Sequence, residues 1–294
     1  GQSTTITVPY TVTDNNGATS TANLVITVTG TNDAPVAQAA SFTVAEDAAV
    51  VNGAVIATDA DAGSTLSYAL NGAAPAGLTF NTDGSYSFNP ANAAYQSLAQ
   101  GQSTTITVPY TVTDNNGATS TANLVITVTG TNDAPVAQAA SFTVAEDAAV
   151  VNGSVTATDA DAGSTLSYAL NGAAPAGLTF NPDGTYTFNP ANAAYQSLAQ
   201  GQSTTLTVPY TVTDNNGATS TANLVITVTG TNDAPVAQAA SFTVAEDAAV
   251  VNGAVTGTDV DAGSTLSYAI NGAAPAGLTF NPDGTYSFNP ANAA

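Results

Sequence analysis

A period of 100 residues is the feature that most constrains this chain. The sequence of residues 1–36 begins again at residue 101 and at residue 201, and the only change in these copies is from isoleucine to leucine at Leu206. A unit of about 100 residues can bury a core of its own, whereas the short units of a solenoid need their neighbours. The period therefore predicts a string of similar domains.

The predicted boundaries lie in the phrase TGTNDAPV, where a long alternating segment ends and a proline stiffens the entry to the next unit. The division gives the last part of one unit, two complete units and the first part of another, at residues 1–33, 34–133, 134–233 and 234–294. The two partial units complement each other in length. This suggests a register chosen on a continuous fibre, or strand exchange between copies.

Apolar and polar residues alternate through each unit, a pattern typical of half-buried β-strands. In the unit that starts at residue 34, this pattern predicts strands at 41–44, 53–59, 65–70, 77–80, 85–88, 104–114 and 120–130. In the last two, aliphatic side chains and Tyr110 face one way and threonines the other. Seven strands with one apolar face each predict an all-β fold of tandem immunoglobulin-like sandwiches.

Two further details belong to this interpretation. Residues 89–100 are the only candidate for a helical turn, and Asp83-Gly84 is typical of a hairpin turn. Four tyrosines alternate in phase with aliphatic residues and are expected in the core or at its edge: Tyr10, Tyr68, Tyr86 and Tyr95.

The charge excludes several classes of function. The chain has 21 acidic side chains and no lysine, arginine or histidine, so its formal charge is −21. Nucleic acids and anionic membrane surfaces are bound through basic patches, and neither is expected as a partner. No apolar run approaches the roughly 18 residues of a membrane helix, so we expect no membrane insertion in this segment.

An enzymatic function is not expected either. Cysteine is absent together with histidine, lysine and arginine, which leaves only an Asp/Glu pair for acid-base chemistry. No pocket motif or oxyanion signature accompanies such a pair.

The acids instead indicate a bound cation. Asp59 and Asp61 stand one residue apart in ATDADAG, and most other acids sit beside turns or strand ends. Clustered carboxylates without a basic partner repel one another. Calcium relieves this because it accepts about 6 to 8 oxygen ligands in irregular geometry. The alternative, solvated turn aspartates, stays open at this point.

ATDADAGSTLSYAL resembles the cadherin segment that carries paired calcium-binding aspartates. TVTDNNGATSTANLVITVTGTNDAP resembles the end of a cadherin repeat and its linker. The combination, together with VAEDA, is most similar to the VCBS and bacterial cadherin-like repeats of giant secreted RTX-type adhesins. The resemblance covers the whole chain and implies cadherin-like domains in a linear rod, with Ca²⁺ at the junctions between consecutive domains.

The resemblance also implies ligand sets, residue by residue. The junction near residue 133 would use Glu46, Asn132, Asp133, Asp159, Asp161 and Asp214. The next would use Glu146, Asn232, Asp233, Asp259 and Asp261. The first would use Asn32, Asp33, Asp59, Asp61 and Asp114. The Asp-Arg-Glu motif of cadherins is absent, and SLAQGQS occupies its approximate position, so we expect about one to three ions per junction.

Other features have simpler interpretations. Asp83 fits local turn chemistry, and Asp47 is either a further ligand or a solvated neighbour of Glu46. The threonine-rich faces are ordinary exposed strand surfaces rather than a sugar- or ice-binding face.

The resulting hypothesis is an extracellular function. The chain would be a calcium-stiffened extender of a secreted bacterial surface adhesin or biofilm matrix fibre, with neighbouring repeats of the same chain as its partners. The alternative is a self-associating module that builds a filament by lateral packing or strand exchange between copies. Direct adhesion by the repeats ranks last, because the units are almost identical.

Overall fold

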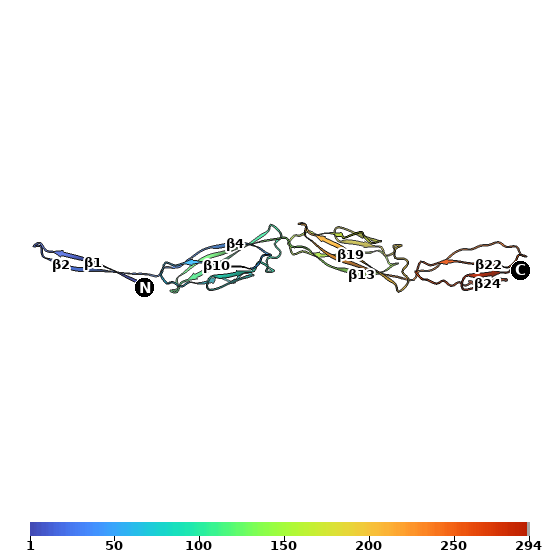
Figure 1. Cartoon of the computed structure of the whole chain (residues 1–294), viewed down its shortest axis with the longest axis horizontal. Helices are drawn as coiled ribbons and strands as arrows, with labels where there is room; N and C mark the ends of the chain where they lie inside the picture. Colours follow the sequence, from blue (N-terminus) through green and yellow to red (C-terminus); the bar gives the residue numbers. More distant parts are fainter. Residues whose placement is uncertain (293–294) are drawn as a thin grey trace. The chain divides into compact units, whose positions relative to one another are not determined.

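The computed structural model describes residues 1–292, which form two compact units (Figure 1). Unit 1 comprises residues 1–133 together with 160–163, and unit 2 comprises residues 134–159 and, within the described range, 164–292. Within the described range the regular structure is β-strand, apart from one 3₁₀ turn, η1 (Pro290–Asn292). No helix in these residues is long and apolar enough to cross a bilayer.

Unit 1 starts with a hairpin of two long strands, β1 (Ser3–Thr13) and β2 (Thr19–Thr29). The strands pair antiparallel from Ser3↔Thr29 to Thr13↔Thr19, around a turn in which Gly17 has a φ of 91°. This hairpin forms a two-stranded sheet with no further strand on either edge (Figure 1). Every residue in it is exposed.

The rest of unit 1 is a sandwich. Its larger sheet has the order β4-β11-β10-β7, and the sheet β5-β9-β8 and the short pair β3-β6 complete it. The strands are β3 (Val36–Ala37), β4 (Ala40–Ala45), β5 (Val51–Ala54), β6 (Ala57–Thr58), β7 (Ser67–Leu70), β8 (Leu78–Phe80), β9 (Ser85–Phe88), β10 (Ser103–Thr113) and β11 (Thr119–Thr129). β4 pairs parallel with β11, and β7 pairs antiparallel with β10.

The central hairpin β10–β11 supplies half of the buried hydrophobic residues of this core. Tyr110, Leu124 and Ile126 are fully buried, and the Tyr110 ring packs 6.0 Å from the ring of Phe80. The Tyr110 hydroxyl donates a hydrogen bond to the backbone carbonyl of Gln38. Alternation places these side chains on one face, and the two neighbouring strands cover both edges of the hairpin.

Unit 2 repeats this sandwich and then adds an incomplete copy of it. The sandwich strands are β12 (Val136–Ala137), β13 (Ala140–Ala145), β14 (Val151–Ser154), β15 (Ala157–Thr158), β16 (Ser167–Leu170), β17 (Leu178–Phe180), β18 (Thr185–Phe188), β19 (Ser203–Thr213) and β20 (Thr219–Thr229). The copy that follows has β21 (Val236–Ala237), β22 (Val251–Ala254), β23 (Gly257–Thr258), β24 (Leu278–Phe280) and β25 (Thr285–Phe288).

The predicted strands agree with the structure in most places. The exceptions are the predicted strand 53–59, which the structure divides between β5 and β6, and β3, which the sequence did not indicate. Residues 89–100 form successive turns rather than a helix. Tyr10 is 49% exposed, contrary to the prediction of a core position, because no second sheet covers β1.

Candidate metal centres

Glu46 is held at the end of β4 by the strand beside it. Its backbone N–H donates to the carbonyl oxygen of Thr129 at 3.0 Å, and its Oε1 accepts the N–H of Thr131 at 2.9 Å. The side chain has no exposed surface, and its Oε2 has no hydrogen-bond partner. A buried carboxylate oxygen without a partner is costly, and a cation bound beside it is one way to offset that cost.

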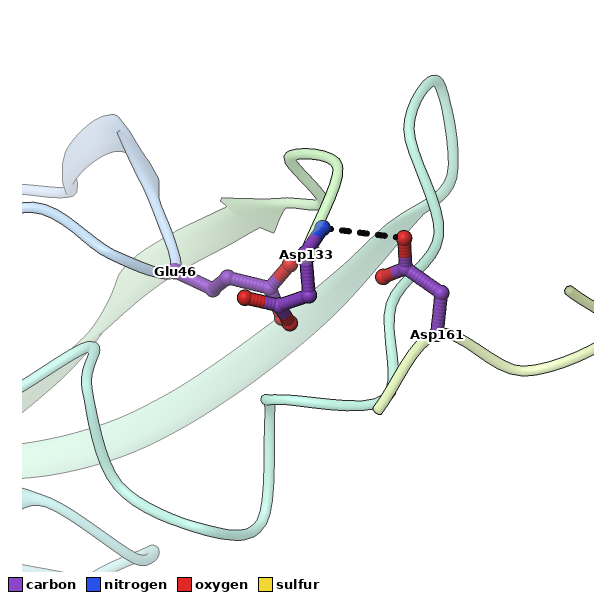
Figure 2. Close-up of side chains that lie close together, drawn as sticks. All are labelled: Glu46, Asp133 and Asp161. Carbon is purple, nitrogen blue, oxygen red and sulfur yellow. Dashed lines mark hydrogen bonds between the residues drawn. The ribbon is translucent and has the colours of Figure 1, made fainter. Parts of the chain in front are cut away.

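Two aspartates lie next to Glu46 in unit 1 (Figure 2). Asp133 ends the long stretch 1–133, and Asp161 lies in the segment 160–163, where the N–H of Ala162 donates to the carbonyl of Ser97 at 3.1 Å. The N–H of Asp133 donates to Oδ2 of Asp161 at 3.1 Å, as the dashed line in Figure 2 shows.

One carboxylate oxygen from each of Glu46, Asp133 and Asp161 lies within 4.8 Å of the others. Burial raises the pKa of Glu46, and the negative charges of Asp133 and Asp47 add to this effect. The hydrogen bond from Thr131 acts in the opposite direction. The site therefore disfavours negative charge unless something positive is bound there.

Unit 2 contains the same arrangement. Oxygens of Glu146, Asp233 and Asp261 lie within 4.8 Å of one another, and the N–H of Asp233 donates to Oδ2 of Asp261 at 3.0 Å. Three buried oxygens have no hydrogen-bond partner: Oε2 of Glu146, Oδ2 of Asp233 and Oδ1 of Asp261. Burial raises the pKa of Asp233, and the charges of Asp147, Asp261 and Asp259 raise it further.

The first predicted junction has the aspartates but no glutamate. The N–H of Asp33 donates to Oδ2 of Asp61 at 2.8 Å, as in the other two sets. The amide of Asn32 donates to Oδ2 of Asp114 at 2.7 Å, and this bond lowers the pKa of Asp114. No three-membered acidic cluster forms here within the described part of the chain.

The remaining predicted ligands lie outside these triads. Asp59, Asp159 and Asp259 accept hydrogen bonds from the hydroxyls of Ser64, Ser164 and Ser264. Asn132 and Asn232 donate side-chain amides to the carbonyls of Asp133 and Asp233. Asp114 and Asp214 are buried, and each accepts the N–H groups of its own TDNNG loop.

Sequence reasoning missed the backbone groups that position the carboxylates. Thr131 and Thr231 orient the two glutamates, and the carbonyls of Ser97 and Ser197 hold the loops of Asp161 and Asp261. The only sequence signal for these two threonines is their position in the linker phrase TGTNDAPV, directly after Thr-Gly. Asp47, whose role the sequence left open, accepts a hydrogen bond from the Thr131 hydroxyl at 2.8 Å.

The donor set fits a hard divalent cation. The ligands available are carboxylate oxygens, several of them buried, and the chain has no basic side chain that could neutralise them. The absence of thiol and imidazole ligands disfavours zinc and copper.

Comparison with known proteins supports the fold. No curated protein matches the chain. Among solved structures, human CDH23 EC21-23 is 20% identical over 87% of this chain and 90% of that one, with a TM-score of 0.57. The Protocadherin GammaB4 extracellular domain is 18% identical over 97% of this chain and 50% of that one, with a TM-score of 0.53. At these identities the likeness is one of fold.

Two protein families match most of the sequence, from residue 32 onward. The bacterial cadherin-like domain matches residues 32–130 and again 132–230. The bacterial Ig domain matches residues 232–294. The two cadherin-like matches cover more than half of the chain, which therefore belongs to the bacterial cadherin-like domain family.

Proposed function

We propose that this chain is an extender segment of an extracellular adhesin or matrix fibre, and that calcium stiffens the connections between its repeats. The observation that carries the proposal is the Glu146–Asp233–Asp261 cluster, with its three buried oxygens that lack hydrogen-bond partners. The Glu46–Asp133–Asp161 cluster has the same composition and the same backbone contacts.

The position of the ligands along the chain suggests how an ion acts. Glu46 and Asp133 belong to the proposed repeat 34–133, whereas Asp161 belongs to the proposed repeat 134–233. An ion held by all three ties the loop of one repeat to the linker and strand end of the repeat before it. Without the ion these carboxylates repel one another, and the connection is free to bend.

An extender needs repeated connections rather than a unique surface. The units differ at few positions, such as Ala54 and Ser154 or Thr82 and Pro182, so each repeat presents nearly the same surface. The sequence match shows that the repeats are cadherin-like. We propose in addition that they bind calcium, that they belong to a secreted adhesin or fibre, and that they act at a bacterial cell surface.

The test compares the 294-residue chain in calcium and in excess chelator, by thermal unfolding and by small-angle X-ray scattering at low concentration. We expect calcium to raise the melting temperature and the maximum dimension. The variant with both Glu46→Gln and Glu146→Gln should bind calcium more than about tenfold more weakly, because it loses one ligand from each cluster. In chelator it should be at least as stable as the native chain, because two buried charges are gone.

A matched control removes the same charge elsewhere. Asp83 and Asp183 lie in exposed Asp-Gly turns and accept hydrogen bonds from Ser85 and Thr185. The variant with Asp83→Asn and Asp183→Asn should keep the full calcium response. A melting temperature and a scattering profile that chelation leaves unchanged would refute the proposal.

A further inference from the structure

Each repeat carries the dipeptide Asn-Gly at three places. In the repeat that starts at residue 34 they are Asn52-Gly53, Asn71-Gly72 and Asn116-Gly117, and the next repeat has them 100 residues later. The side-chain carbon of an asparagine is open to attack by the backbone nitrogen of the following residue. Glycine shields that nitrogen least because it has no side chain. The structure gives the three dipeptides different surroundings.

The first dipeptide is fixed inside a strand. Asn52 and Gly53 belong to β5, where they pair with Ser87 and Tyr86 of β9. An extended backbone at asparagine turns the next nitrogen away from the side chain, so attack requires this pair to leave β9. The Tyr86 side chain also packs so closely on Gly53 that a Cβ there would collide with it. Pairing and packing therefore protect Asn52.

The third dipeptide is held by an aspartate. The N–H of Gly117 donates to the carbonyl of Asp114 at 3.3 Å, and the N–H of Asn116 donates to Oδ1 of Asp114 at 2.9 Å. The Asn116 side-chain amide donates to Oδ1 of Asn32. In the next repeat Asp214 accepts the equivalent two N–H groups. The attacking nitrogen must lose its proton, and a carboxylate beside it opposes this loss.

The second dipeptide lies in an exposed bend directly after β7. The N–H of Asn71 donates to the carbonyl of Pro109 at 2.9 Å, and both Asn71 and Gly72 are exposed. Gly72 has a φ of 153°, and a Cβ there would meet open space. In the described part of the chain the N–H of Gly72 donates no hydrogen bond. The attacking nitrogen is therefore unpaired and belongs to an exposed residue.

A hydroxyl group on the neighbouring strand adds a second difference. The Thr111 hydroxyl of β10 donates to Oδ1 of Asn71 at 2.5 Å, and Thr211 makes the same contact with Asn171. Attack on the side-chain carbon places negative charge on this Oδ1. A donor that already points at the oxygen stabilises that charge. The bend is repeated as well, because Gly172 has a φ of 146°.

We propose that Asn71 and Asn171 are the preferred sites of spontaneous deamidation among the Asn-Gly dipeptides of the complete repeats. The nitrogen of Gly72 gives up its proton and bonds to Cγ of Asn71, while the bond from Cγ to the amide nitrogen breaks. Ammonia leaves with that proton, and a cyclic imide remains. Water then opens the ring at one of its two carbonyl carbons, which produces aspartate or isoaspartate. The reaction consumes one water, releases one ammonia and needs no oxidant.

Both products change the end of β7. Either product adds one negative charge to a chain that has no basic side chain to offset it. Isoaspartate also lengthens the main chain by one carbon, directly after the hydrogen bond between Asn71 and Pro109. Older molecules should therefore be more negative and less regular at these two positions. The proposal is independent of calcium, because neither asparagine belongs to an acidic triad.

The test is incubation of the whole chain at mildly alkaline pH, followed over time by peptide mass spectrometry with fragmentation that separates aspartate from isoaspartate. The chain lacks lysine and arginine, so the protease should cut after aromatic residues. The peptide ALNGAAPAGLTF, at 69–80 and 169–180, then reports both sites, and chromatography separates it from its isomer at 269–280. Deamidation should be at least about tenfold faster there than at Asn52 or Asn116, because those residues must first open locally.

Two pairs of variants test the role of the hydroxyl. Thr111→Val together with Thr211→Val keeps the side-chain shape and removes the donor, so deamidation of the reporting peptide should slow by about two- to tenfold. Thr111→Ser together with Thr211→Ser keeps the donor and should retain the native rate.

Unfolding the chain in urea provides a further control. The three kinds of dipeptide should then react at similar rates, because the contacts that distinguish them are gone.

Three results would overturn the proposal. Peptides that contain Asn52 or Asn116 could deamidate as fast as the reporting peptide. The valine variant could react as fast as the native chain, or faster. The ranking could persist in urea, which would assign it to the flanking sequence rather than to the structure.

Discussion

Residues 1–30 and 101–130 have the same sequence, and the structure places them in different surroundings. Both form a hairpin of two strands of 11 residues in the same register. Tyr10 is 49% exposed and Tyr110 is fully buried. Hairpin formation thus follows from local pairing and turn chemistry, whereas burial depends on the strands that flank the hairpin.

The reverse comparison holds for residues 140–147 and 240–247, which also share one sequence. Residues 140–145 form β13 beside β20, and Glu146 is fully buried next to Asp233 and Asp261. Residues 240–245 have no strand beside them, and Glu246 is exposed. A short single strand requires a partner, whereas a long hairpin supplies its own.

The largest expected contrast comes from truncating the central tyrosine of each hairpin. Tyr110→Ala should destabilise unit 1 by about 3–5 kcal/mol, because it leaves a cavity against Phe80 and Tyr68 and removes the hydrogen bond to Gln38. Tyr10→Ala should leave that transition unchanged. Urea unfolding of the monomer, followed by circular dichroism, measures both. Equal effects would mean that β1–β2 is packed in solution.

A smaller contrast comes from the glycine that follows each hairpin. A Cβ on Gly130 would collide with the backbone carbonyls of Leu98 and Ala99, whereas one on Gly30 would meet only the carbonyl oxygen of Gln2, at 3.3 Å. Gly130→Ala should cost about 1–3 kcal/mol of unfolding free energy in unit 1. Gly30→Ala should stay within about 0.5 kcal/mol. A tolerated alanine at position 130 would show that the turn before β10 moves away easily.

The smallest contrast concerns pH. Burial raises the pKa of Tyr110, and the nearby Tyr68 adds to this. Tyrosine in the unfolded chain ionises near pH 10, before the buried side chain does, so unit 1 should lose stability as the pH rises above about 10. Tyr110→Phe should cost about 0.5–1.5 kcal/mol at neutral pH through the lost hydrogen bond. It should also flatten the alkaline decline.

Tyr10→Phe provides the control for this measurement. It should leave the neutral stability of unit 1 unchanged, since Tyr10 is exposed. Unfolding free energies at several pH values test both variants. An alkaline slope that Tyr110→Phe leaves intact would assign the pH dependence to the other tyrosines of unit 1 whose pKa is raised by burial, Tyr86 and Tyr95.

Much of the fold could be predicted from alternation, because period-two patterns and Gly-rich turns act over short distances. The strands at 85–88, 104–114 and 120–130 are examples. The two-residue strand β3 could not be predicted, because it exists only through its pairing with β6. The acidic residues could be named as candidate ligands, yet grouping Glu46 with Asp133 and Asp161 required contacts between residues up to 115 positions apart.

The sequence by itself determined the repeat, the all-β class, the long hairpins and the need for an external counterion, since each depends on local pattern or on composition. Only the tertiary structure decided which copy of an identical segment is buried. It also decided that Glu46 and Glu146 are enclosed among carboxylates while Glu246 is exposed. The physical reason is that burial and electrostatic environment belong to contacts between distant segments, and identical segments here have different neighbours.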